Sequence, residues 1–159
     1  MTEADTRNHR LVLPADANHY GTLYAGSLLR FALEAAYASG SRAIGPAANL
    51  MLRRVLNVEC RRPVPVGTLV ELRGAVLQVR QAALVVGVVG MPLVGQTVPW
   101  MDALMTFVQV DDQGQPADLP VAVETVSATG PWPPLLTRLE KLAHLRGSTT
   151  DWLTGPPAD

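Results

Sequence analysis

The sequence predicts an α+β fold in which an antiparallel sheet wraps around one long helix, with a short helix near the C-terminus. Three observations support this fold. Residues 26–42 combine alanine, leucine and glutamate without an interior proline, which is typical of a long helix. Four apolar, β-branched stretches follow, at about 50–60, 68–79, 82–90 and 99–110. Turn-forming residues between these stretches indicate antiparallel connections.

The N-terminal elements follow from local signals. Residues 9–13 predict a short edge strand that ends at Pro14, and a polar loop leads from there to the helix. Because this helix is apolar almost all round, we expect it to be buried on all sides. Gly40 and Gly45 are expected to close it.

The 159 residues divide into a main domain and a C-terminal extension. The main domain is expected to comprise residues 1–120, of which residues 1–8 are flexible. Residues 121–159 are expected to form a proline-rich linker, an amphipathic helix at about 135–146 and a disordered tail.

Composition limits the classes of function. Hydrophobic residues make up 48% of the chain and charged residues 17%, so we expect a homodimer or larger homo-oligomer to cover part of the apolar surface. The net charge of −1 argues against nucleic-acid binding. The absence of a long apolar stretch and of a signal-peptide core predicts a cytoplasmic protein that does not bind membranes. Cys60 is the only cysteine, and the three histidines lack metal-ligand spacing, so no metal site is expected.

The segment 14–36 carries the chemistry. It runs from a polar turn through two glycines into the long helix, which bears one acid, Glu34. A glycine-rich turn before a helix directs backbone N–H groups and the positive end of the helix dipole toward one point. Such a point can polarise a carbonyl oxygen, and a nearby acid can act as base or nucleophile. This arrangement suits acyl transfer.

Three segments resemble the hotdog-fold acyl-CoA thioesterases. The first is Asp16-Ala-Asn18-His-Tyr-Gly21-Thr-Leu-Tyr-Ala-Gly26, which is similar to the family's signature before its central helix. The others are the strand turn that begins Arg62-Pro-Val and the final strand from Ala103. They occur in the family's order and cover about residues 10–120. The resemblance implies a hotdog domain that dimerises by joining two sheets and binds acyl-CoA at the subunit interface. Coenzyme A then enters only as part of the substrate, with no separate cofactor.

The resemblance also assigns roles to residues of the first segment. It implies that Asn18 helps to place the thioester or the attacking water, and that the Gly26 N–H contacts the thioester oxygen. Gly21 and Thr22 belong to the same motif and are assigned to substrate binding. The family's catalytic acid falls on Leu33, which cannot act as a base.

Glu34 follows Leu33, and a shift of one residue rotates a side chain by about 100° around a helix. Hotdog thioesterases similar to fluoroacetyl-CoA thioesterase place a glutamate at this shifted position. They combine it with a threonine and a histidine where this chain has Gly26 and Cys60. Arg62 and Arg80 are assigned to the phosphates of coenzyme A, since arginine forms bidentate phosphate contacts.

Each candidate also has a purely structural interpretation. Glu34 is either the general base or the partner of Arg30 in an ion pair one turn away on the helix. Asn18 is either an orienting group or a turn former that bonds its own backbone. The two glycines form an oxyanion site or permit the turn. A lone cysteine such as Cys60 is more often buried and inert than nucleophilic.

Two functions follow from these interpretations. The first is an acyl-CoA thioesterase that uses Glu34, Asn18 and Gly26. The alternative is a catalytically weak or inactive hotdog protein that binds acyl-CoA or a related ligand, which is motivated by Leu33 at the acid position. A dehydratase or isomerase on the same fold is disfavoured, because no histidine lies on or beside the predicted helix.

Overall fold

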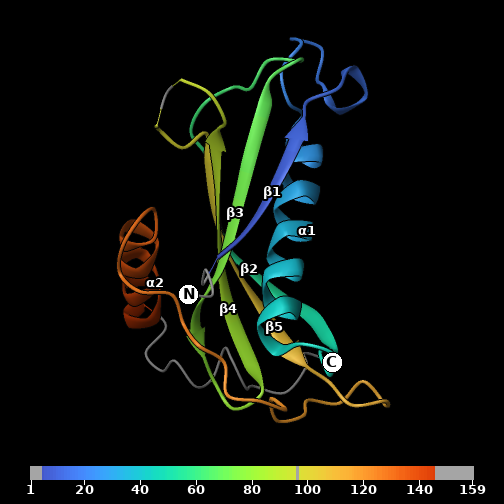
Figure 1. Ribbon diagram of the computed structural model, residues 1–159, viewed down its shortest axis with the longest axis vertical. Helices are drawn as coiled ribbons and strands as arrows, with labels where there is room; N and C mark the ends of the chain where they lie inside the picture. The colour runs from blue at the N-terminus through green and yellow to red at the C-terminus, as the bar shows by residue number, and fades with distance from the viewer. Residues whose placement is uncertain (1–4, 96, 146–159) are drawn as a thin grey trace.

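The computed structural model describes residues 5–95 and 97–145. Five strands form one antiparallel sheet in the order β1-β3-β4-β5-β2, and two helices lie on its opposite faces (Figure 1). The elements in chain order are β1 (Asp5–Leu11), the 3-10 turn η1 (Pro14–Asp16), α1 (Ala25–Ile44), β2 (Leu50–Cys60), β3 (Leu69–Val79), β4 (Ala83–Pro92), β5 (Met101–Gln109) and α2 (Pro133–Leu145). The predicted fold class is confirmed: a long helix against an antiparallel sheet, then a short C-terminal helix.

Helix α1 packs on the sheet through one face, not through all of them as expected. Its buried face is rich in small residues, and Phe31 is its largest fully buried side chain. The helix approaches β3 so closely that a Cβ atom on Gly74 would lie 2.1 Å from the Ser39 Oγ. The opposite face leaves Leu29 and Tyr37 exposed. A single sheet can cover only one side of a helix, so this apolar face is left for another contact.

The ends of α1 differ slightly from the prediction. The helix continues through Gly40, which is buried against Leu50, and ends at Ile44. Gly45 follows as its C-cap, and the Gly45 N–H donates to the Ser41 carbonyl. Gly40 is therefore a site of close helix–sheet packing and does not end the helix.

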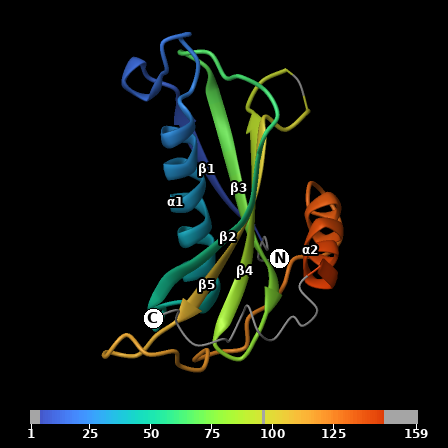
Figure 2. The same cartoon turned by 180° about the vertical axis from the view of Figure 1, so that it is seen from behind.

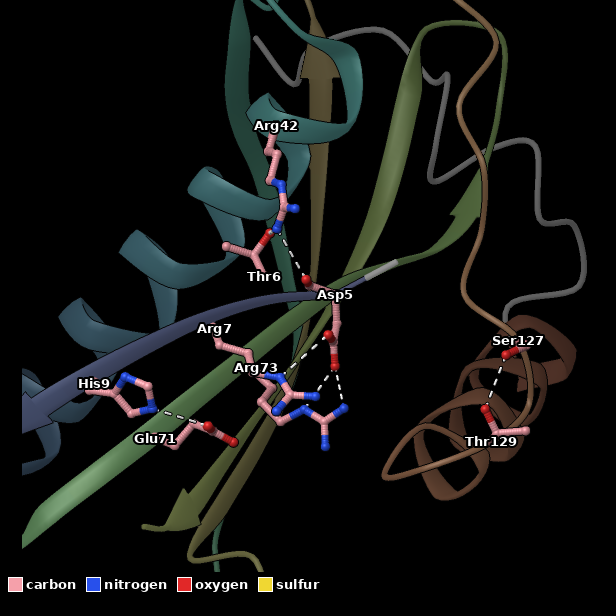
Figure 3. Close-up of polar contacts among 9 residues, drawn as sticks. All are labelled: Asp5, Thr6, Arg7, His9, Arg42, Glu71, Arg73, Ser127 and Thr129. Atoms are coloured by element: carbon pink, nitrogen blue, oxygen red, sulfur yellow. Dashed lines mark hydrogen bonds and ion pairs between the residues drawn. The ribbon is translucent and has the colours of Figure 1, made fainter. Parts of the chain in front are cut away.

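Strand β1 begins at Asp5 and ends at Leu11, so the prediction of a strand at 9–13 is wrong at both ends. Of the residues 1–8 that we expect to be flexible, residues 5–8 are part of β1, and residues 1–4 lie outside the described residues. The long-range contact with β3 explains the difference: Asp5 pairs with Ala75 in the ladder and forms an ion pair with Arg73 (Figure 3). Sequence periodicity over seven residues does not reveal such a partner.

The other predicted strands are confirmed with small shifts at their ends. Strand β2 occupies the predicted range, and β4 extends to Pro92, two residues beyond the expected end. Strands β1 and β2 form the two edges of the sheet. In Figure 2, which shows the molecule from behind, β2 lies in front, beside α1.

Helix α2 covers the face of the sheet opposite α1 (Figures 1 and 2). Its Leu135 and Leu139, with the preceding Trp132, are buried in a second hydrophobic cluster with residues of β3, β4 and β5. The predicted amphipathic helix is therefore confirmed and begins two residues early, at Pro133. The predicted disordered tail lies outside the described residues. In the part of the chain that the structure describes, no helix is long and apolar enough to cross a membrane.

Candidate functional site

A cavity of about 310 Å³ lies beside the N-terminal end of α1. The loop before α1 and the segment after β2 form its walls, and backbone hydrogen bonds join these two segments. The Leu23 N–H donates to the Val64 carbonyl at 2.7 Å, and the Val66 N–H donates to the Gly21 carbonyl at 3.0 Å. The lining residues are Asn18, Thr22, Leu23, Ala25, Leu28, Cys60, Arg61, Arg62, Pro63 and Val64. The fold therefore brings three predicted site residues, Asn18, Thr22 and Arg62, to one cavity.

The side chain of Asn18 holds the loop that carries it. Its Oδ1 accepts hydrogen bonds from the Tyr20 N–H at 3.0 Å and from the Thr22 N–H at 3.2 Å. Its Nδ2 donates to the Thr22 Oγ1 at 3.0 Å. Gly21 allows this tight turn with a φ of 73°, in the left-handed region that favours glycine. Asn18 thus acts as a turn former in a single chain, while it also lines the cavity.

Gly26 lies in the first turn of α1, next to the cavity-lining Ala25. Tyr24 is the N-cap residue, and among the described residues it makes no side-chain capping hydrogen bond. The first N–H groups of a helix have no partner within the helix, and they carry the positive end of its dipole. The Tyr24 ring packs so closely over Gly26 that an added Cβ would lie 2.4 Å from the Tyr24 Cε1. Any larger residue at this position would have to displace the exposed Tyr24 ring.

Glu34 lies further along α1 and is engaged by two arginines. One carboxylate oxygen forms an ion pair with Arg10 on β1, and the other lies 3.6 Å from Arg30 Nη1. The ion pair with Arg30 is therefore present, and Arg10 adds a second partner. The side chain is 45% exposed and lines two further cavities, one between α1 and β2 and one between α1 and β1. The fold does not bring Glu34 to the cavity of Asn18 within one chain.

Leu33, at the position where the family has its acid, is half-buried and packs against the core. It also lines the cavity of about 310 Å³ between α1 and β2, together with Tyr37 and Phe107. In this chain that position contributes apolar surface and no titratable group.

The two arginines predicted to meet coenzyme A lie at opposite ends of β3. Arg62 precedes this strand and lines the cavity with Asn18, whereas Arg80 follows it, in the turn to β4. An eleven-residue strand spans about 33 Å, since each residue rises by about 3.3 Å. One chain therefore does not present both arginines to one phosphate group.

Cys60 is exposed, contrary to the expectation of a buried cysteine. As the last residue of an edge strand, it has a neighbouring strand on one side only, and its side chain reaches the cavity. Within residues 5–95 and 97–145, no group of three or more histidine, cysteine, aspartate or glutamate residues could hold a metal ion.

Two residues at these sites were not among the site residues assigned from the sequence, although Arg61 was one of several arginines considered for the phosphates of coenzyme A. Arg10 contacts Glu34 from a different element, so helical spacing gives no hint of it. Arg61 lines the cavity, and its Nε donates to the Asp102 Oδ2 at 2.8 Å. This hydrogen bond, together with the charge of Asp102, raises the pKa of the Arg61 guanidinium. A signal for Arg61 existed in its place directly before the Arg62-Pro63 motif.

No protein-family model matches this chain, and no curated protein matches it in sequence. Solved structures do match. An acyl-CoA hydrolase from Staphylococcus aureus, in complex with butyryl coenzyme A, coenzyme A and coenzyme A disulfide, is 21% identical with a TM-score of 0.73, over 92% of this chain and 85% of that one.

Two further structures agree with this match. An apo-hexameric acyl-CoA thioesterase is 24% identical with a TM-score of 0.70, over 91% of this chain and 94% of that one. An acyl-CoA hydrolase from Bacillus cereus is 20% identical with a TM-score of 0.73, over 90% and 88% of the two chains. The chain therefore has the hotdog fold that these acyl-CoA hydrolases and thioesterases share.

Proposed function

We propose that this protein binds acyl-CoA at the cavity beside the N-terminal end of α1 and hydrolyses its thioester. The observation that carries the proposal is this cavity, where the start of a helix, Asn18 and Arg62 come together. N–H groups at a helix start stabilise the negative charge that develops on a thioester oxygen under attack. Arg62 suits the phosphates of coenzyme A. Likeness to acyl-CoA hydrolases, one of them holding coenzyme A, supports the same ligand class.

In the proposed reaction, a water molecule attacks the thioester carbonyl carbon while Glu34 takes its proton. The carbonyl oxygen gains negative charge beside the Gly26 N–H. The carbon–sulfur bond then breaks, and the protonated Glu34 returns its proton to the sulfur of coenzyme A, which leaves as the thiol. Since Glu34 lines other cavities than Asn18 does within one chain, the proposal requires Glu34 from a second copy of the chain.

A second copy has a suitable surface along β2. This edge strand is eleven residues long and exposes Met51, Leu52 and Val55. The neighbouring face of α1 exposes Leu29 and Tyr37. Edge strand β1 is shorter and carries charged side chains, which is typical of an edge protected from pairing. We propose that two copies associate along β2, and the hexameric state of one structural neighbour supports a homo-oligomer.

One observation favours the alternative function, an acyl-CoA-binding protein without hydrolysis. Both oxygens of Glu34 face arginine side chains, from Arg10 and Arg30. A carboxylate held in this way is less available to accept a proton from water. If the assembled protein keeps these ion pairs, binding continues without turnover.

A Glu34→Gln variant separates the two functions. We expect the wild-type protein to hydrolyse at least one of acetyl-, butyryl-, octanoyl- and palmitoyl-CoA. Glu34→Gln should then lower kcat at least about 100-fold, since a general base contributes a factor of that order or more. Release of the free thiol gives the rate, and circular dichroism checks the fold.

The matched control is Glu140→Gln, which removes an exposed carboxylate on α2. It should hydrolyse at the wild-type rate. Turnover by Glu34→Gln at the wild-type rate would exclude Glu34 as the base. Binding of coenzyme A to the wild-type protein in calorimetry, with no turnover of any of the four esters, would establish the alternative.

A further inference from the structure

Four charged side chains form a cluster at the end of the sheet nearest the cavity, on the face that α2 covers. Asp102 on β5 and Glu59 on β2 provide the acids, and Arg61 and Arg138 provide the bases. Arg61 Nε lies 2.8 Å from the Asp102 carboxylate, and Arg61 Nη2 lies 3.0 Å from the Glu59 carboxylate. Arg138, on α2, forms an ion pair with Asp102 and lies 3.8 Å from Glu59. It also donates to the Asn57 Oδ1 at 2.7 Å.

The two acids need both arginines. Glu59 and Asp102 are directly opposite each other in the β2–β5 ladder, where like charges repel. Asp102 is only 5% exposed, and a buried carboxylate is unfavourable without charged partners. Arg61 and Arg138 each contact both acids, and their two positive charges balance the two negative charges. Removal of Arg138 would leave Arg61 with two carboxylates that it shares with Arg138 in the described part of the chain, and the position of Arg61 would then change.

Arg61 is the point where this cluster meets the cavity. Its side chain contacts the acids, and it lines the cavity with Asn18 and Cys60. The N–H groups of Arg61 and Arg62 donate to the same carbonyl, that of Trp100, at 2.9 and 3.3 Å. The wall of the cavity at residues 60–64 is therefore attached through its backbone to Trp100, which directly precedes β5, and through the Arg61 side chain to Asp102 on β5.

We propose that Arg138 is a positioning residue for this cavity: through Asp102 and Glu59, helix α2 holds Arg61 and the adjoining wall in the shape that binds coenzyme A esters. This inference rests on the proposed function for its ligand. It gives the C-terminal helix, which lies on the face of the sheet opposite α1, a role in ligand binding (Figure 1).

An Arg138→Met variant should bind ligand more weakly without a change in the reaction. We expect its KM for an accepted acyl-CoA, and its Kd for coenzyme A, to rise about tenfold, the size of one loosened charge-assisted hydrogen bond. The kcat should stay within about twofold, because Asn18, Gly26 and Glu34 do not contact α2. Lys141→Met is the matched control, since it removes an exposed cation from the same helix.

A double-mutant cycle tests whether Arg138 acts through Arg61. In an Arg61→Met background, Arg138→Met should raise KM and Kd no further, because the side chain that it positions is gone. Independent, multiplying effects of the two substitutions would overturn the proposal. So would an Arg138→Met variant with the wild-type Kd and KM. Arg138→Lys, which retains the charge, should recover part of the affinity.

Amide hydrogen exchange separates this inference from the proposed function. Arg138→Met should speed exchange of the Arg61 and Arg62 amides, whereas Lys141→Met should not. Suppose that these amides exchange faster in Arg138→Met, but the protein neither binds coenzyme A nor hydrolyses its esters. The link between α2 and the cavity wall would then be supported, and the proposed ligand would be rejected. Unchanged exchange at these amides would reject the link, whatever the activity.

Discussion

At Asn18, one side-chain oxygen accepts hydrogen bonds from two backbone N–H groups of its own loop. The same residue lines the cavity beside Cys60 and Arg62. Its two possible roles, turn former and substrate ligand, therefore depend on different atoms. The turn needs the acceptor Oδ1, whereas a contact with substrate or water can use the donor Nδ2. Substitutions that retain one atom and remove the other distinguish these roles.

We expect Asn18→Ala to lower the free energy of unfolding by about 1–3 kcal/mol, because the N–H groups of Tyr20 and Thr22 lose their acceptor. Asn18→Asp keeps that acceptor and should unfold within about 0.5 kcal/mol of wild type. Urea unfolding followed by circular dichroism measures both values. Equal losses for the two variants would contradict a turn role for Oδ1.

At the level of single elements, helix α2 is held on the sheet by a few buried side chains. Leu135 is 1% exposed and packs over β4, where a Cβ on Gly87 would lie 3.2 Å from the Leu135 Cδ1. Leu136, the next residue, is only partly buried. The helix therefore has one strongly packed leucine beside a weakly packed one, which gives an internal comparison.

Leu135→Ala should destabilise the protein by about 2–5 kcal/mol, the range for deleting a fully buried leucine side chain. Leu136→Ala should cost clearly less, since part of its surface already faces solvent. Thermal unfolding in a calorimeter gives the comparison. If both variants unfold alike, α2 does not pack in the register that the structure shows.

Across the molecule, five of the exposed large apolar residues lie on α1 and β2, and others lie in the loops and at the strand ends. The low charge fraction of 17% predicts a covered surface, and we propose that β2 and α1 provide it. The cavity with Asn18 lies at the end of β2, so a copy added along this edge would border it. Assembly and ligand binding are therefore linked in the proposed function.

Val55→Glu should reduce the assembled protein to monomers, because a carboxylate buried in the β2 contact has no partner there. The control is Val121→Glu: Val121 is 45% exposed and Val55 47%, but Val121 lies in the segment between β5 and α2, outside the strands. Light scattering after size-exclusion chromatography measures the mass. An assembly that survives Val55→Glu and dissociates with Val121→Glu would place the contact elsewhere.

The order and type of the elements, and the place of the motif before α1, can be read from the amino-acid sequence. Strand alternation, helix length and turn residues are local properties, so β2 was predicted at its observed bounds and α1 within two residues at each end. The leucines of α2 predicted its buried face for the same reason. The resemblance to hotdog thioesterases singled out Asn18, Thr22 and Arg62, although not the cavity that unites them.

Which side chains meet depends on the packing of the folded chain. Arg10 reaches Glu34 across 24 positions of sequence, and Arg138 reaches Asp102 across 36. Such contacts follow from how the strands and helices pack, and no periodicity encodes them. The start of β1 was missed for the same reason, since its partner on β3 lies about 70 residues away. The acid on α1 and its pairing with Arg30 were therefore visible in the sequence, while its contact with Arg10 was not.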